Sequence, residues 1–199
     1  MKLILASNNQ KKLVEMREIL SQLGFDVVSQ WDAGLNIEVE ETGETFAENA
    51  FLKADAVCKA SGMPAIADDS GLVVDALDGA PGVYSARYGG EGLDDVDRYI
   101  LLLENMKDIS NRAAKFVSAI VCVFPNGDVL SAEGECLGEI LHSPRGDGGF
   151  GYDPVFFVHE ASRGMAEITA EEKNTISHRA KALREFCVNL EEYMTQTTE

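Results

Sequence analysis

The sequence has little positive charge and no long apolar run, and each shortage excludes a class of protein. Its 199 residues include 17 lysines and arginines against 34 aspartates and glutamates, a formal net charge of −17 at pH 7. Such a field repels nucleic acid and anionic membranes, so neither is expected as a partner. No run of about 18 apolar residues occurs, and the opening "MKLILASNNQ" becomes polar too early for a signal peptide. We therefore expect a cytoplasmic protein, in which any phosphate site is built locally from cations, helix N-termini or a divalent ion.

Cysteines and histidines are also few, and their spacing is not that of a redox or zinc site. The cysteines lie far apart without a CxxC pair, and the three histidines lack the spacing of zinc ligands. We interpret the cysteines as reduced packing residues. They are Cys58, Cys122, Cys136 and Cys187.

Apolar residues make up 45% of the chain, enough to form a core in one α/β unit or in two closely packed lobes. Apolar spacing and turn residues predict alternating strands and helices, with a hairpin at "PNGD". The expected strands are 2–6, 25–30, 65–67 resuming at 72–74, 113–124, 129–140 and 149–158. The expected helices are 13–24, one within 41–62 that begins at a Thr45–Glu48 capping box, 93–108 and 175–193. The apolar stripes expected on the last two are Val96, Ile100, Leu103 and Met106 on the first of them, and Ile176, Ala180, Leu183, Cys187 and Leu190 on the second. This mixture indicates an α/β or α+β fold.

Two features are candidates for binding phosphate. "SNNQKK", residues 7–12, lies between an expected strand and an expected helix, so N–H groups and lysines gather at the positive helix end. It is neither GxGxxG nor a P-loop, and an ordinary N-cap with solvated lysines is the simpler interpretation. Lys53 falls within the apolar stripe of Phe46, Ala50 and Ala54 on the next helix. Such a lysine either extends to solvent or points into a polar cleft, and the pattern leaves both open.

Two carboxylates interrupt an apolar strand in "PAIADDSGLVVDAL", residues 64–77. Because neighbouring strand residues face opposite sides, we expect one of Asp68 and Asp69 to face a ligand and the other to make structural hydrogen bonds. Carboxylates at a strand end lie in the usual ligand crevice of α/β folds, and with Glu41 and Glu44 they make an oxygen-liganded Mg²⁺ site reasonable. An Asx turn that binds nothing is the alternative.

Two later segments combine aromatic and cationic side chains. "GFGYDP" offers Phe150, Tyr152 and Asp153, which suit stacking on a flat base and binding of its edge; a bulged strand with packed aromatics is the alternative. On a continuous helix, Arg179 lies beside the apolar stripe, whereas His178 reaches the same side only through irregular first-turn geometry. The segment "KNTISHRAK" contributes Lys173, His178 and Arg179.

In their order along the chain, these blocks resemble one family. "SNNQKK", "EETGETFAENAFLKA", "PAIADDSGLVVDALDGAPGVYSARY", "GGFGYDPVF" and "SHRAKAL" are similar to signature blocks of the non-standard purine nucleoside triphosphate pyrophosphatases, the inosine triphosphatase family. Asn8 is a departure, because the family pattern there is Ser/Thr-Gly-Asn; asparagine also tolerates left-handed geometry. The resemblance, over about residues 3–190, implies an α/β fold with a mixed sheet, elongated and two-lobed around a central substrate cleft, with 1–199 as a single domain.

The resemblance also implies an activity. Members cleave ITP, dITP, XTP and dXTP to the monophosphate and pyrophosphate, use Mg²⁺, form homodimers and keep deaminated purines out of nucleic acids. Asp69 is then the expected general base and Mg²⁺ ligand, with Glu41 as a second metal carboxylate and Asp68 as a less certain one. The implied substrate-binding residues are Ser7, Asn8, Asn9, Gln10, Lys11, Lys12, Lys53, Ser70, Arg87, Phe150, Gly151, Tyr152, Asp153, Lys173, His178 and Arg179.

Two rival functions stay open on the same scaffold. One is a pyrophosphatase for other modified nucleotides, and the other is a nucleotide-binding sensor without turnover. The presence of Asp69, Lys53 and Lys173 argues against the sensor. For base choice, Arg179 or a backbone N–H aimed at a 6-oxo group would be left unpaired by adenine, at a cost of about 1–3 kcal/mol.

Overall fold

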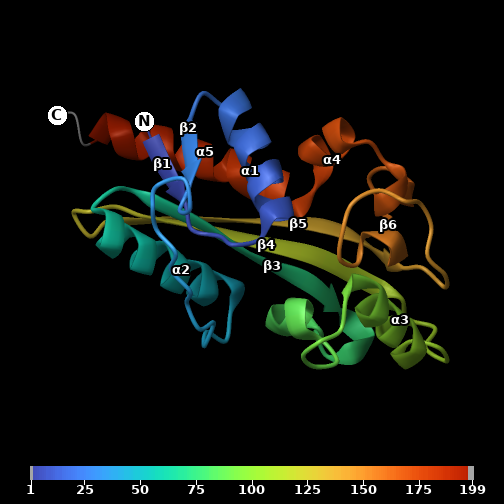
Figure 1. Cartoon of the computed structure of the whole chain (residues 1–199). Coiled ribbons are helices and arrows are strands. Elements are labelled where there is room, and N and C mark those ends of the chain that lie inside the picture. Colours follow the sequence, from blue (N-terminus) through green and yellow to red (C-terminus); the bar gives the residue numbers. More distant parts are fainter. Residues whose placement is uncertain (1, 197–199) are drawn as a thin grey trace. The chain divides into compact units, whose positions relative to one another are not determined.

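The computed structural model describes residues 2–196 and confirms the α/β class (Figure 1). The helices are α1 (Gln10–Gln22), α2 (Phe46–Ser61), α3 (Asp95–Asn105), α4 (Ala170–Ile176) and α5 (His178–Gln196). The strands are β1 (Lys2–Leu5), β2 (Asp26–Ser29), β3 (Ala65–Val74), β4 (Ala113–Val123), β5 (Val129–Ile140), β6 (Phe156–Val158) and β7 (Arg163–Gly164). Short 3-10 helices occur at Asp75–Leu77, Gly82–Arg87, Asp153–Val155 and Met165–Glu167. Among residues 2–196, no helix combines the length and apolarity needed to cross a bilayer.

The strands form a mixed sheet in the order β2-β1-β3-β4-β5-β6-β7. β1 is parallel to both β2 and β3, whereas β6 is antiparallel to β5 and β7. The predicted "PNGD" hairpin is present, since the Phe124 N–H donates to the Asp128 carbonyl at 2.9 Å. The sheet therefore combines parallel crossover units with antiparallel strands, as a mixed α/β fold requires.

The described chain divides into two compact units. The first holds the residues up to Asp69, 118–134 and those from Arg179 onward, and the second holds 70–117 and 135–178. Each unit has its own buried core. The central cleft and the single-domain organisation that the resemblance implies stay predictions.

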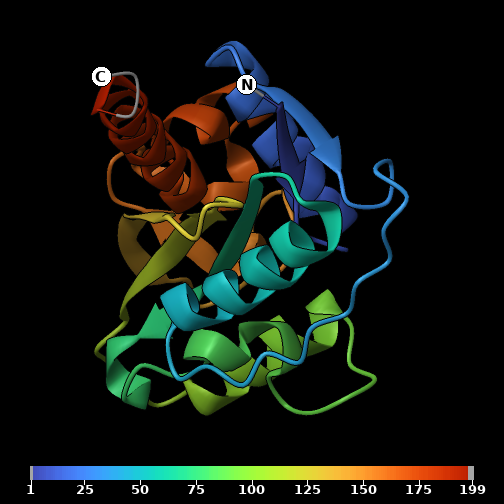
Figure 2. The ribbon, with the colours of Figure 1, turned by 90° about the vertical axis from the view of Figure 1, so that its left-hand side faces the viewer.

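The first unit has helices on both faces of its strands, and the strand alternation explains why (Figure 1). On one face, Leu3 and Ile66 belong to the core that α1 and α5 cover. On the other face, Ile4 and Ala65 belong to the core that α2 covers. Figure 2 shows α2 and α5 on opposite sides of these strands. A residue's position in β3 therefore decides which helices it meets.

The predicted capping box begins α2, where Thr45 accepts from the Glu48 N–H and Glu48 reaches back to the Thr45 N–H. In the second unit, α3 forms as expected, and its buried face agrees with the predicted stripe at Met106 but not at Val96 and Ile100. Leu102 and Met106 are fully buried, whereas Val96 and Ile100, expected in the apolar stripe, are 46% and 45% exposed. The run "YILLLENM" contains two overlapping apolar stripes, and packing selects one of them.

The predicted boundaries within β3 and within the terminal helix were wrong. β3 does not end before Asp68 but continues from Ala65 to Val74, so both carboxylates lie in mid-strand rather than in an Asx turn. The predicted terminal helix is two helices, because Ser177 adopts extended geometry (φ −67°, ψ 158°) between α4 and α5. Serine competes with helical hydrogen bonding and favours such ends. The predicted stripe from Ala180 to Leu190 is buried on α5, but Ile176 belongs to the other helix.

Candidate active site

Asp68 and Asp69 project to opposite faces of β3, as the alternation predicted. Asp68 lies on the face covered by α1 and α5 and is 1% exposed. One carboxylate oxygen lies 2.8 Å from Lys12 Nζ and 3.2 Å from Arg179 Nη2, and the other accepts from Ser118 Oγ at 2.5 Å. Burial alone would raise the pKa of Asp68, but the guanidinium and the ammonium outweigh it and hold that pKa well below the usual range.

Arg179 completes this buried ion-pair network. Its guanidinium is 1% exposed and also donates to Glu15 of α1. Burial would lower the pKa of Arg179, but the carboxylates of Asp68 and Glu15 raise it above its ordinary value. Charges buried this deeply need such partners, since an unpaired one costs several kcal/mol. The sequence left open whether Asp68 faces a ligand or makes structural hydrogen bonds. These contacts favour the structural role.

Asp69 lies on the α2 face, where Lys53 reaches it. The Lys53 ammonium donates to Asp69 Oδ1 at 3.0 Å, to Glu41 Oε1 at 2.7 Å and to the Asp68 carbonyl at 3.0 Å. Only 16% of the lysine side chain is exposed, so it points into a polar cluster and not to solvent. The polar-cluster interpretation of Lys53 is confirmed.

The electrostatics of this cluster suit a general base. Burial raises the pKa of Asp69 despite the lowering effect of Lys53. Burial would lower the pKa of Lys53, but Asp69 and Glu41 raise it, so the ammonium stays protonated. A carboxylate whose pKa moves toward neutrality accepts a proton more readily than an ordinary one.

The same cluster offers carboxylate oxygens that could bind Mg²⁺. Glu41 and Asp69 direct one oxygen each at a single cationic point, now the Lys53 ammonium. Between Lys2 and Gln196, no group of three or more histidine, cysteine, aspartate or glutamate side chains gathers as for a metal. Mg²⁺ sites on phosphate-bearing ligands commonly use just one or two protein carboxylates, with phosphate and water oxygens supplying the rest. The donor set of Glu41 and Asp69 fits that ion.

The loop of residues 7–12 is an N-cap in this structure. Asn9 Oδ1 accepts from the N–H groups of Lys11 and Lys12 at 3.1 and 3.2 Å, and Ser7 Oγ accepts from the Asn9 N–H. Lys12 turns inward to Asp68, whereas Asn8 and Lys11 are exposed. Asn8 does not use the left-handed geometry that its replacement of glycine allows, since only Asp78 and Ser162 among the described non-glycine residues have positive φ.

In the second unit, "GFGYDP" is a tight turn and not the first half of a strand. Asp153 accepts from the Phe150 N–H at 2.9 Å and from Lys173 Nζ at 2.7 Å. Gly149 has φ +75°, and a Cβ there would lie 2.1 Å from the Asp153 carboxylate. The strand expected from 149 therefore begins only at Phe156.

The aromatic residues of this turn differ in availability. Phe150 is half-buried, with Lys173 Nζ 4.6 Å from its ring centroid. Tyr152 is 5% exposed, its hydroxyl donates to the Ser85 carbonyl at 2.8 Å, and burial raises its pKa. Phe150 is thus the ring that is open to a flat ligand, whereas Tyr152 anchors the turn through its hydrogen bond to Ser85.

The remaining predicted residues are spread over the second unit. His178 is buried and stacks on Phe116, with ring centroids 4.8 Å apart and planes at 14°. Arg87 is exposed over the Tyr84 ring at 5.1 Å. Ser70 is half-buried in β3. Ser177 ends α4 directly before His178, the first residue of α5.

Sequence reasoning missed Glu15 and Ser118 in the Asp68 network. Ser118 carried a signal, as a polar residue inside the apolar run of β4. Glu15 carried none, because a glutamate on an amphipathic helix is ordinary. The cysteines are buried free thiols as expected, and burial raises the pKa of Cys122 to about 12 and of Cys187 to about 11.

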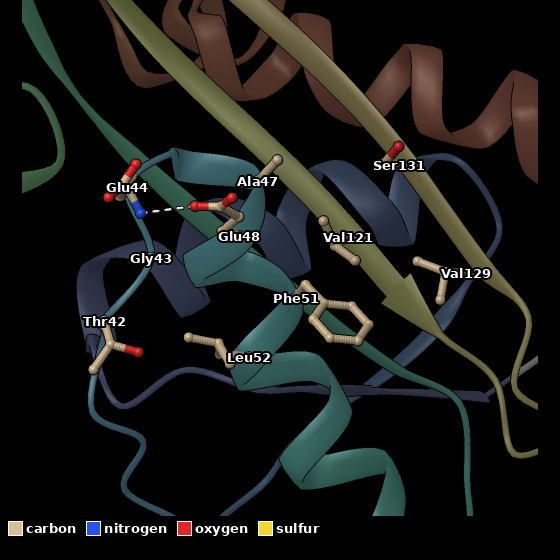
Figure 3. A pocket seen from close by; sticks show the side chains of 10 residues that line it. All are labelled: Thr42, Gly43, Glu44, Ala47, Glu48, Phe51, Leu52, Val121, Val129 and Ser131. Carbon is tan, nitrogen blue, oxygen red and sulfur yellow. Dashed lines mark hydrogen bonds between the residues drawn. The ribbon is translucent and has the colours of Figure 1, made fainter.

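The first unit also contains a hollow of about 530 Å³ beside α2, β4 and β5 (Figure 3). Its walls are mainly apolar and include Phe51, Leu52, Val121 and Val129. Glu44, one of the carboxylates considered for Mg²⁺, lines it, but Asp69, Glu41 and Lys53 do not. The candidate chemistry therefore rests on the Asp69 cluster and not on this hollow.

The fold and these clusters define a mixed α/β protein whose first unit holds a lysine-bound carboxylate pair suited to phosphate chemistry and whose second unit holds an aromatic turn suited to a flat ring. The chain belongs to the Ham1 family, whose model matches residues 3–189.

Named relatives cover nearly all of the chain. A Thermus thermophilus dITP/XTP pyrophosphatase is 50% identical over 186 residues, which are 92% of this chain and 89% of that protein. A Bacillus subtilis dITP/XTP pyrophosphatase is 47% identical over 190 residues, covering 94% and 96%. The solved structure of a HAM1 protein from Coxiella burnetii matches with a TM-score of 0.88 and 43% identity, over 96% of this chain and 99% of that one.

Proposed function

We propose that the protein hydrolyses non-standard purine nucleoside triphosphates, ITP, dITP, XTP and dXTP, to the monophosphate and pyrophosphate. The observation that carries the proposal is the Lys53 ammonium held between Asp69 and Glu41, in a chain about half identical to proteins named dITP/XTP pyrophosphatases. In a chain of charge −17, a small anionic substrate needs local cations, and Lys53 together with a bound Mg²⁺ would supply them beside Asp69 and Glu41. Removal of deaminated purines from the nucleotide pool follows from this activity.

In the proposed reaction, Asp69 takes a proton from a water whose oxygen attacks the α-phosphorus. The bond from that phosphorus to the bridging oxygen breaks, and pyrophosphate leaves with the bonding electrons. Lys53 offsets negative charge on the phosphate oxygens while it holds Asp69 in place. Mg²⁺, when bound by Glu41 and Asp69, would supply further charge neutralisation. The raised pKa of Asp69 supports its role as base.

For the base, we propose that the Phe150 ring stacks on the purine and that Asp153 and Lys173 hold the turn and its charge. The sequence left Arg179 or a backbone N–H as donor to the 6-oxo group. Because two carboxylates already engage the Arg179 guanidinium, the geometry supports the backbone N–H. Adenine, with a 6-amino donor, would leave that N–H unpaired.

The decisive test is pyrophosphate release from ITP, XTP, ATP and GTP, with Mg²⁺ and with EDTA. Metal-dependent release that favours ITP and XTP is expected. Equal hydrolysis of all four would contradict the base-recognition argument while keeping the chemistry. Tight ITP binding without release would instead indicate the sensor. The homodimer is a separate part of the proposal, and light scattering would test it.

A further inference from the structure

The segment that carries Glu41 has neither helix nor strand (Figure 2). Its residues nevertheless alternate in exposure. It links β2 to α2, and residues 36–43 have no regular structure. The half-buried members are Leu35, Ile37, Val39 and Glu41, and the exposed ones are Asn36, Glu38 and Glu40. This period of two is that of an extended chain with one face inward. The register of the segment therefore decides whether Glu41 or a neighbour meets Lys53.

Gln30 sets that register from one end. It is 3% exposed, and its side-chain amide binds both polar groups of Ile37: Nε2 donates to the Ile37 carbonyl and Oε1 accepts from the Ile37 N–H, each at 3.2 Å. Its backbone N–H donates to Leu5, and its carbonyl accepts from Leu35 at 2.8 Å. The Gln30 side chain thus supplies the donor and the acceptor that a neighbouring strand would offer to the Ile37 backbone.

The same amide reaches the N-terminal loop. Gln30 Nε2 also donates to Asn8 Oδ1 at 2.6 Å, so both hydrogens of the amide are used. Asn8 is the residue that departs from the Ser/Thr-Gly-Asn pattern, and glycine could not supply this acceptor. The departure therefore has a partner in the structure, and it joins residues 7–12 to the segment that carries Glu41.

The other end of the segment is held by the first turns of α2. Asn49, fully buried, accepts from the Gly43 N–H at 2.8 Å, and Glu48 accepts from the Glu44 N–H at 2.7 Å (Figure 3). A Cβ at Gly43 would lie 2.7 Å from the Glu48 Cβ, so only glycine fits there. Glu41 lies between these anchors and Ile37.

We propose that Gln30, together with Asn8, is a positioning residue that fixes the register of residues 35–43 and so aims Glu41 at the Lys53–Asp69 cluster. A slip of one residue would present Glu40 or Thr42 in its place. The inference rests on the proposed function for its effect on turnover, but the positioning itself concerns the protein alone.

The test replaces Gln30 with methionine, which keeps the length of the side chain and removes its hydrogen bonds. Gln22→Met, at an exposed position near the end of α1, is the matched control. We expect the Mg²⁺ concentration that half-activates pyrophosphate release from ITP to rise about tenfold in Gln30→Met, with kcat near the parent value at saturating Mg²⁺. Loss of a merely structural contact would lower stability without moving the Mg²⁺ dependence.

Hydrogen exchange in the absence of nucleotide and metal gives a second readout. The amides of residues 37–41 should exchange faster in Gln30→Met than in the parent protein. In Gln22→Met their exchange rates should equal those of the parent. Asn8→Gly should change both readouts in the same direction by less, because it removes the Asn8 contacts with Gln30 and with the Ile37 carbonyl but leaves the two hydrogen bonds between Gln30 and Ile37.

A folded Gln30→Met protein with parent-like Mg²⁺ dependence and parent-like exchange would overturn the proposal. If that variant does not fold, parent-like behaviour of Asn8→Gly in both readouts would overturn it equally. If the parent releases no pyrophosphate from any triphosphate, the proposed function fails, and the exchange of residues 37–41 still decides whether Gln30 positions the segment.

Discussion

The two units hold their candidate functional residues in opposite ways. In the first unit, the charged groups are brought together over long sequence distances: Asp68 meets Lys12 of α1 and Arg179 of α5. In the second unit, one short turn holds Phe150 and Asp153 together, and Lys173 contacts both. The first arrangement depends on the whole layered core, and the second depends on local turn chemistry.

This difference separates stability from ligand contact. Buried charges in the first unit are expensive unless every partner is present, so a change there acts on folding or on the chemical step. Asp153 holds the turn through the Phe150 backbone N–H, so we expect a change of the half-buried Phe150 ring to act on ligand binding more than on folding. Asp68 and Asp69 show the contrast within one strand, because Asp68 lies in a buried ion-pair network and Asp69 lies beside Lys53 and Glu41.

The largest expected effect is on turnover, from Asp69→Asn. The amide keeps the size and a hydrogen-bond acceptor for Lys53 but cannot take a proton, so kcat for ITP should fall about 10³-fold. The measurement is pyrophosphate release at saturating Mg²⁺, with urea unfolding as the check on folding. A well-folded variant that keeps substantial activity would remove Asp69 from the role of base.

The largest expected effect on stability comes from the other face of the strand. Asp68→Asn leaves the buried Arg179 and Lys12 charges short of a partner, which should lower the free energy of unfolding by about 3 kcal/mol. Asp69→Asn should lower the free energy of unfolding much less, because the neutral amide removes a charge that burial disfavours. Urea unfolding of both variants beside the parent measures the contrast.

The pH dependence of stability gives this contrast a sign. The pKa of Asp68 is depressed in the folded state, so its contribution to stability is present above the usual aspartate value of 3.8 and is lost as pH falls through the lower folded value. Asp68→Asn should therefore lose most stability near neutrality, and the gap to the parent should narrow only in strong acid. A gap that is constant with pH would contradict the ion-pair explanation.

The sequence predicted what local chemistry determines. The capping box at Thr45 and the inward option for Lys53 each follow from a few adjacent residues. The tight turn around Gly149 was not predicted, because the apolar residues of "GFGYDPVFFV" also fit a strand. The opposite faces of Asp68 and Asp69 followed from strand geometry alone.

Pairing across the fold could not be predicted in this way. Within β3, the buried Asp68 is paired with Arg179, which is 111 positions further along the chain. The local sequence "ADDSG" contains no pattern that predicts this partner. Gln30 is similar, because its use depends on where Ile37 and Asn8 come to lie. The charged half of the candidate site was therefore predicted as a set of residues but not as a network.

A smaller effect is expected in the second unit, from Phe150→Leu. Loss of the aromatic face should raise KM for ITP about tenfold, since stacking of one base is worth about 1–3 kcal/mol, with little change in kcat. Phe157→Leu, at another half-buried phenylalanine of the same unit, is the control. Equal KM values in the two variants would mean that Phe150 does not meet the base.

The smallest effect, and the one that tests the electrostatics most directly, is a displacement of the pH profile. Burial raises the pKa of Asp69, and Lys53 is the strongest of the groups that lower it. Lys53→Met should therefore raise that pKa further and move the acid limb of kcat/KM to higher pH, because the base acts only when deprotonated. Lys53→Arg keeps the positive charge and should leave the acid limb near its parent position, whatever either substitution does to the maximal rate.

Glu41→Gln gives the opposite test. Since Glu41 raises the pKa of Asp69, this variant should move the acid limb of kcat/KM to lower pH. Limbs that move together in Lys53→Met and Glu41→Gln would mean that Asp69 does not set the acid side of the profile.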